Sequence, residues 1–277
     1  MQAGYFSTVW RDVKESPGWF GRLCLLGLLS FIPIFGQIVL LGYSYGWARD
    51  IAWNMRTSMP ARIFGNEDGR LYSRGLHMFV IALVFGIVPY VLQQAWAKMA
   101  GGGFGAASSL AFGADAGSLM FSLLACVVVL ALMVFCTVFS YVGSIRSTVY
   151  CRLSPGFQLK RLWSMFRYDV SGIVRIFFMV LLVTAISTAV FCGGIFSLSF
   201  LMVSGPALLS DSPVLMPLFL VGALLMLALF FAYMVATAFT IVIEARALGY
   251  WVAQFDVPSW RGEDDPMPFE LVGASQG

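Results

Sequence analysis

Long apolar runs alternate with short basic segments along most of this 277-residue chain. Four of the runs are about as long as the 20 or so residues with which an α-helix crosses a bilayer. We predict one membrane-spanning helix in each of them, at residues 75–96, 119–142, 173–196 and 214–243. The pattern therefore indicates an all-α polytopic helical bundle that forms a single transmembrane domain.

The first apolar run, residues 23–47, is interrupted in its middle by Pro33 and Gly36. It can form either a fifth span or a hairpin that returns to the side from which it started. Basic residues flank both ends, at Arg22 and Arg49, and basic flanks tend to remain in the cytosol. The flanks favour the hairpin, and the full span stays open as the alternative.

The segments between the runs differ in charge, and the difference predicts the topology. Two of them, 48–74 and 143–172, are basic elbows that we place in the cytosol. Two others, the glycine-rich 97–118 and the short 204–213, are nearly uncharged and are expected outside. An amphipathic segment (1–22) begins the chain and an acidic tail (244–277) ends it. The tail is predicted to start in the cytosol, where it either docks on the basic elbows or is solvated.

The second elbow contains the sequence GFQLKRLWSMFRYDV, whose apolar residues recur at helical spacing. Trp163 belongs to this apolar stripe, whereas Lys160, Arg161 and Arg167 lie off it. We predict a short amphipathic helix in the cytosolic interface, with these four residues facing lipid or a partner. A packed elbow without lipid specificity is the alternative interpretation.

Three segments share the order of apolar span, aromatic and small residues, arginine, then amphipathic continuation. They read IVLLGYSYGWARDIAWNM, VFCTVFSYVGSIRSTVYC and MVATAFTIVIEARALGYWVAQF. Internal symmetry of this kind occurs in transporters, whose binding sites form between repeats. Duplication of a membrane hairpin produces the same pattern, so the repeat alone does not indicate transport.

Composition agrees with a membrane protein, since 60% of the residues are hydrophobic, 11% are charged and the mean hydropathy is +0.85. These values exclude an ordinary soluble domain. The net charge of +3 is uneven along the chain, which sets orientation and gives no reason to expect a nucleic-acid partner. We expect an interfacial belt at the cytosolic level, made by five of the eight tryptophans: Trp47, Trp53, Trp163, Trp251 and Trp260.

Few residues suit catalysis or metal binding. His77 is the only histidine, and the five cysteines lie in or beside apolar runs without a CxxC motif. No phosphate loop, nucleophile elbow or HExxH motif occurs. We therefore expect no cofactor, no metal ion and no enzymatic activity.

Polar residues inside the spans are the remaining candidates. Arg175 and Glu244 both fall at the cytosolic level, and we predict an ion pair between them. The uncharged polar residues either line a path or join helices by hydrogen bonds. They are Gln37, Gln93, Gln94, Thr137, Ser140, Thr184, Ser187, Thr237 and Thr240.

Several of these stretches resemble a known family. The runs SPGWFGRLCLLGLLSFIPIFGQIVLLGYSYGWARDI and NEDGRLYSRGLHMFVIALVFGIV are similar to an uncharacterised bacterial and archaeal membrane family, the domain of unknown function numbered four thousand and thirteen. The later GFQLKRLW and ARALGYW fit its second half. In the first elbow, MPARIFGNEDG replaces the proline-aromatic acidic segment usual in the family, and DVPSW stands near the C-terminus instead. The resemblance implies a membrane fold and no established activity.

These observations together predict a non-enzymatic membrane scaffold or accessory subunit in the cytoplasmic membrane of a prokaryote. Its expected partners are membrane lipids, including anionic headgroups, and a protein partner or a second copy of the chain. A small-solute transporter or channel, with a site between the repeats, is the alternative.

Overall fold

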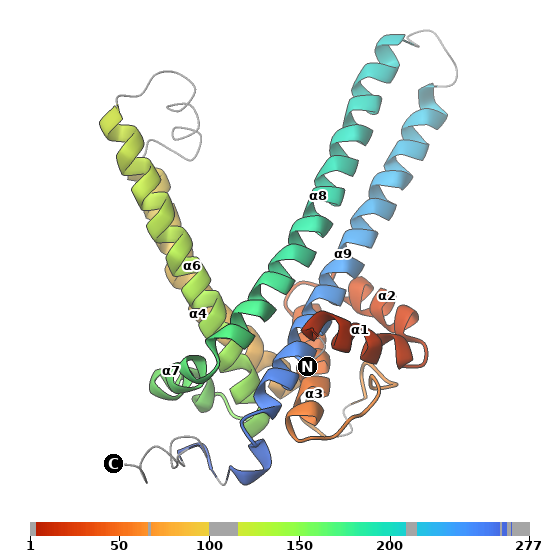
Figure 1. The fold of residues 1–277 in the computed structure, drawn as a ribbon. Coiled ribbons are helices and arrows are strands. Elements are labelled where there is room, and N and C mark those ends of the chain that lie inside the picture. The colour runs from red at the N-terminus through yellow and green to blue at the C-terminus, as the bar shows by residue number, and fades with distance from the viewer. Residues whose placement is uncertain are drawn as a thin grey trace. The chain divides into compact units, whose positions relative to one another are not determined.

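The computed structural model describes residues 4–65, 68–99, 116–208, 215–260, 262–264 and 267, and every regular element among them is helical (Figure 1). The α-helices are α1 (Tyr5–Glu15), α2 (Trp19–Leu29), α3 (Phe35–Ala52), α4 (Leu71–Met99), α6 (Ala116–Tyr150), α7 (Leu159–Tyr168), α8 (Val170–Leu208) and α9 (Leu215–Ala253). Two short 3-10 helices, η1 (Ser154–Phe157) and η2 (Val257–Ser259), complete them.

Four helices are long and apolar enough to cross a membrane, which confirms the predicted spans. Their spanning segments are Leu71–Ala95, Leu124–Tyr150, Val170–Phe200 and Phe219–Ala253. Helices α8 and α9 each contain 39 residues, which corresponds to about 58 Å at 1.5 Å per residue. Since the hydrocarbon core of a bilayer is about 30 Å thick, both helices extend well beyond it.

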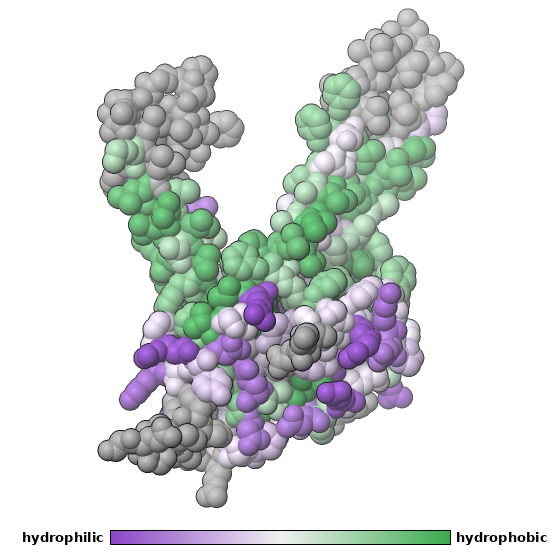
Figure 2. All heavy atoms as spheres, in the orientation of Figure 1, coloured by the Kyte–Doolittle hydropathy of each residue, from purple (hydrophilic) through white to green (hydrophobic). Residues whose placement is uncertain are grey.

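The long helices expose apolar side chains along much of their length (Figure 2). On α8, for example, Leu182 is 61% exposed and Val190 is 64% exposed. Such surfaces are unfavourable in water and are suited to lipid acyl chains. Hydrophilic side chains gather at one end of the helices, beside α1 in one part of the chain and beside α7 in the other (Figure 2).

The chain divides into two compact units, and each is described separately. Unit 1 contains residues 1–76 and 170–277, with α1, α2 and α3 packed against α9, and with α8 lying along α9. Unit 2 contains residues 77–169, with η1 and α7 packed against α6.

In unit 1, the first apolar run is broken into α2 and α3, as the hairpin alternative requires. Ile34, at the break, has a φ of +62°, which places it in the sparsely populated left-handed half of backbone space. Directly after the break, a methyl group on Gly36 would overlap the carbonyl oxygen of Leu29. The break therefore needs glycine where the chain turns back past the end of α2.

The beginning of α4 crosses α3 closely within unit 1. A side chain on Gly42 would overlap the carbonyl of Leu71, and one on Gly75 would overlap the carbonyl of Ile38. Glycine is thus required on both helices for the backbones to approach each other.

Unit 2 contains a second close approach. A Cβ atom on Gly143 of α6 would lie 2.6 Å from the carbonyl oxygen of Gly156 in η1. Ile81 covers Gly156, and the Thr148 hydroxyl lies 3.3 Å from the Met78 sulfur, which joins α6 to α4. The predicted elbow is therefore packed from its first residues, and α6 continues eight residues beyond its expected end at residue 142.

Helix α9 also continues beyond its expected end, so the first ten residues of the predicted acidic tail are helical and packed. Trp251 in this extension and Trp47 on α3 are both fully buried. The expected interfacial belt is wrong for these two tryptophans, because hydropathy gives the depth of a residue in the membrane but not the direction of its side chain.

Candidate functional site

Helix α7 has the amphipathic character that the sequence predicts. Leu162 and Met165 are fully buried in unit 2. Leu159 and Trp163 are 57% and 45% exposed, on a face that also bears exposed cationic residues. We define the α7 patch as the exposed residues Leu159, Lys160, Trp163 and Arg167.

The α7 patch contains both cationic and apolar side chains, and they lie next to one another on the helix. At about 100° per residue, Lys160 and Arg167 lie within some 20° of each other around the helix axis, and Trp163 lies beside them. The Trp163 ring is held by stacking on Phe166 and Phe139, with centroid distances of 5.4 and 6.2 Å. Arg161 points to another side of α7 and is half-buried. The structure thus brings together three of the four predicted residues.

The predicted ion pair between Arg175 and Glu244 is not formed in the described part of the chain. Glu244 accepts a hydrogen bond of 3.1 Å from the Tyr45 hydroxyl of α3. Arg175 instead borders a cavity together with Arg56 and Tyr250. Arg175 lies near the N-terminal end of α8 and Glu244 near the C-terminal end of α9, and the two side chains lie against different groups.

The hydroxyl groups inside the spans bond locally. Thr137, Ser187, Thr237 and Thr240 each donate to the carbonyl oxygen four residues earlier in their own helix. The donor of each of these hydroxyl groups is therefore satisfied within its own helix, and these hydrogen bonds do not join neighbouring helices.

A buried arginine organises the polar end of unit 1. Arg246 on α9 is 1% exposed and bonds to Asp12 of α1 through two nitrogens, at 3.0 and 2.9 Å. It also donates to the carbonyls of Trp47 and Thr57, at 2.8 and 3.2 Å. Its guanidinium lies 4.0 Å from the centre of the Trp47 ring, in cation–π geometry. One side chain thereby connects α1, α3, α9 and the first elbow.

Unit 2 contains a corresponding arginine. Arg146 on α6 is also 1% exposed, and it donates to the Gln158 side-chain oxygen at 2.9 Å. Its other terminal nitrogen lies 3.9 Å from the Met165 sulfur of α7. In both units a tyrosine four residues later contacts the guanidinium, Tyr150 at 5.3 Å and Tyr250 at 5.6 Å. The sequence repeat contains both arginines, Arg146 in the second elbow and Arg246 in the predicted acidic tail, but it does not show that either side chain is buried.

A cavity of about 430 Å³ lies beside Arg246 in unit 1. Its walls come from α1, the first elbow and α9, and they carry hydroxyl, carboxylate and guanidinium groups: Thr8, Arg11, Asp12, Glu15, Ser16, Arg56, Thr57, Ser58, Arg246 and Tyr250. A second cavity of about 520 Å³ shares Thr8, Arg56 and Tyr250 with it and adds the more apolar Phe6 and Met179.

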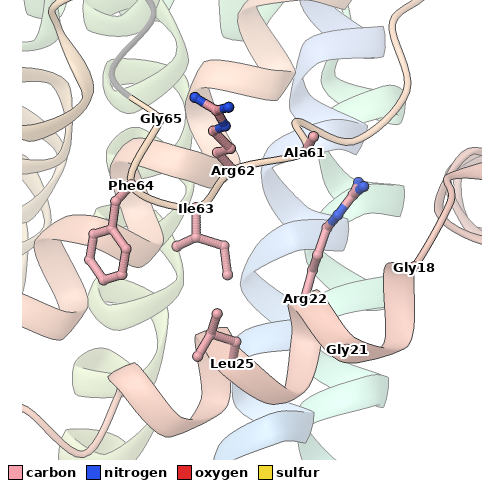
Figure 3. A pocket seen from close by; sticks show the side chains of 9 residues that line it. All are labelled: Gly18, Gly21, Arg22, Leu25, Ala61, Arg62, Ile63, Phe64 and Gly65. Atoms are coloured by element: carbon pink, nitrogen blue, oxygen red, sulfur yellow. The ribbon is translucent and has the colours of Figure 1, made fainter.

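A wider, open groove of about 810 Å³ lies between α2 and the first elbow (Figure 3). Leu25 and Ile63 point toward each other across it, whereas the Arg62 side chain points away from them and Arg22 extends from α2 (Figure 3). Arg22 is already used structurally, since it donates to the Met59 carbonyl at 2.6 Å.

A cluster of charged side chains stabilises the first elbow (48–74), which borders this groove. Asp68 pairs with Arg49 at 2.9 Å and with the buried Arg74, which also donates to the Gly42 carbonyl at 3.2 Å. Partial burial raises the pKa of Asp68, but Arg74, the backbone N–H of Arg70 and Arg49 outweigh it. The net result is a pKa below its ordinary value of 3.8.

Within the described residues, no cluster of histidine, cysteine and carboxylate side chains is arranged to hold a metal ion. The architecture is that of an all-helical polytopic membrane protein with packed polar ends. The chain belongs to the family described as protein of unknown function (DUF4013), whose model matches residues 25–196. No curated protein and no solved structure matches the chain.

Proposed function

We propose that this protein is a non-enzymatic membrane scaffold that holds anionic lipid at its cytosolic face through the α7 patch. The observation that carries the proposal is the combination of two exposed cations and two exposed apolar side chains on one face of α7. An amphipathic helix of this composition binds the interface of an anionic bilayer.

The position of α7 in the chain supports this function. Only Asp169 separates α7 from the long apolar helix α8, so α7 is tethered where a membrane-spanning helix begins. Basic residues next to a span contribute roughly 1 kcal/mol each to the attraction of an anionic leaflet. We assign this leaflet to the cytosolic side of a prokaryotic cytoplasmic membrane, in agreement with the basic elbows.

The test uses the full chain in nanodiscs that contain brominated phospholipid. The quenching of Trp163 is obtained as the difference between the parent and a Trp163→Phe variant. We expect strong quenching with anionic phosphatidylglycerol, and a clear loss of it in a Lys160→Glu/Arg167→Glu variant.

A matched variant, Lys160→Glu/Arg161→Glu, changes the same charge but places one substitution off the α7 patch. It should lose less quenching than the first variant. Equal quenching in all three proteins, or equal quenching in phosphatidylglycerol and phosphatidylcholine, would show that α7 does not engage anionic lipid.

A further inference from the structure

Two cavities of unit 1 share Thr8, Arg56 and Tyr250, and both are lined by residues outside the α7 patch. We propose that they bind the phosphate of an anionic phospholipid or of a free phosphate ester, between α1, the first elbow, α8 and α9. Arg11, Arg56 and Arg175 would surround the phosphate. Phe6 and Met179 would contact the apolar part of a lipid.

The charge of the cavities favours an anion. Arg246 and Asp12 neutralise each other by their direct pairing. The walls then present Arg11, Arg56 and Arg175 against a single carboxylate, Glu15. These three arginines are exposed and make no hydrogen bond or ion pair with another described residue.

The guanidinium groups are therefore available for a ligand. A guanidinium presents a planar set of donors that matches phosphate oxygens. Basic pockets between membrane helices on the cytosolic side are known to suit phospholipid headgroups.

Hydroxyl groups in the cavity walls can also form hydrogen bonds with a phosphate ester. Thr8 and Tyr250 border both cavities, and Ser58 borders the more polar one. The Tyr250 hydroxyl is held in place because it donates to Asp12 at 2.6 Å, so its oxygen can still accept a hydrogen bond. The buried Arg246 keeps α1 and the elbow at a fixed separation, which makes the site preformed.

The two cavities differ in polarity in the way that an amphiphile requires. The cavity beside Arg246 is bordered by charged and hydroxyl groups, whereas the second also has Tyr5, Phe6 and Met179 in its walls. Phe6 is 44% exposed on α1, and α8, which carries Met179, leads into the apolar part of the molecule. A phosphate and an acyl chain can thus be accommodated together.

The experiment places a photoreactive group in the second cavity, by Phe6→p-benzoylphenylalanine in the full chain. The protein is reconstituted in nanodiscs with equal phosphatidylcholine and phosphatidylglycerol, and mass spectrometry identifies the crosslinked lipid. We expect roughly tenfold enrichment of phosphatidylglycerol, because a charge-assisted hydrogen bond contributes about one order of magnitude in affinity. Adding Arg56→Gln/Arg175→Gln should abolish the enrichment.

The matched control, Lys160→Gln/Arg167→Gln, removes the same charge from the α7 patch and should leave the enrichment unchanged. Failure of the α7 proposal therefore does not affect this site. A second measurement records the unfolding temperature in pure phosphatidylcholine nanodiscs with and without inorganic phosphate.

The outcomes identify the source of the phosphate. Enrichment that depends on Arg56 and Arg175 assigns the site to a lipid headgroup. Stabilisation by inorganic phosphate that depends on the same arginines, without enrichment, assigns it to a free phosphate ester. If the Arg56→Gln/Arg175→Gln variant equals the parent in both measurements, the proposal is wrong.

Discussion

Two arginines occupy matching places in the two units and use different partners. Arg246 in unit 1 pairs with a carboxylate, Asp12, and with two backbone carbonyls. Arg146 in unit 2 contacts the Gln158 amide and the Met165 thioether. Both are 1% exposed, and both have a tyrosine four residues later.

The difference shows what the internal repeat preserves. In each unit the arginine fastens a short amphipathic helix to the end of a long one, α1 to α9 in unit 1 and α7 to α6 in unit 2. The guanidinium is common to both units, whereas the groups that it contacts on the short helices differ: a carboxylate on α1 and a thioether on α7. The repeated feature is thus an anchoring point for a surface helix.

We expect the largest effect from a substitution that breaks the anchor of unit 1, the Arg246–Asp12 pair. Asp12→Ala leaves Arg246 as a buried charge without its carboxylate, and removal of one member of a buried pair costs about 3–5 kcal/mol. We expect a loss of this order in the free energy of unfolding in detergent micelles, followed by tryptophan fluorescence. Glu15→Ala, on the exposed side of the same helix, should change it by less than about 0.5 kcal/mol. Equal effects of the two variants would contradict the anchor.

The next prediction tests whether the Arg146 anchor of unit 2 acts independently of the Arg246 anchor of unit 1. Gln158→Ala removes a hydrogen bond to the Arg146 guanidinium, a type of bond that contributes about 1.5–3 kcal/mol. We expect faster hydrogen exchange in residues 159–168 and unchanged exchange in residues 5–15. Asp12→Ala should produce the reverse pattern. Faster exchange in both segments from either substitution would mean that the anchors are not local.

The glycine contacts extend the comparison to backbone packing. Gly75→Ala in unit 1 drives a methyl group into a carbonyl of α3, and Gly143→Ala in unit 2 places one 2.6 Å from the Gly156 oxygen. Overpacking of this kind costs about 1–3 kcal/mol, and the closer contact at Gly75 should cost more. The measurement is the thermal unfolding of each variant. Gly86→Ala, which meets no atom within 4 Å, is the control and should be neutral or slightly stabilising.

The smallest effect is a pH dependence confined to unit 1. The pKa of Asp68 is lowered by folding, so its pairing stabilises the protein fully above pH 3.8 and the contribution disappears as the pH falls through the lower, folded pKa. Asp68 is one-third exposed, so the contribution should be at most about 1 kcal/mol. Asp68→Asn should remove this part of the acid sensitivity in pH-dependent unfolding. An unchanged pH profile would contradict the role of the pair.

The sequence predicts the spans well because lipid requires long apolar helices, and the helical spacing of apolar residues likewise predicts α7 and its buried Leu162. It predicts the ends of α6 and α9 poorly. Arg146, Glu244 and Arg246 interrupt the apolar runs, and a buried arginine with partners looks the same in a sequence as one in solvent.

The sequence also does not predict which groups an individual side chain contacts, for a related reason. The number of membrane crossings puts Arg175 and Glu244 at one level, but it does not fix the direction of either side chain around its helix axis. Glu244 faces α3, where Tyr45 meets it. The cavity that contains Arg175 needs α1 beside α9, and this contact joins residues more than two hundred positions apart.

The length of α9 has a mechanical consequence. It is a single helix of 39 residues, and the Arg246 end is fixed to α1, α3 and the first elbow. A slide by one residue along its axis would displace the guanidinium by about 1.5 Å and break every one of these bonds. Helix α9 therefore cannot slide freely along its axis, and a force that moves it is transmitted directly to α1 through the Arg246–Asp12 pair.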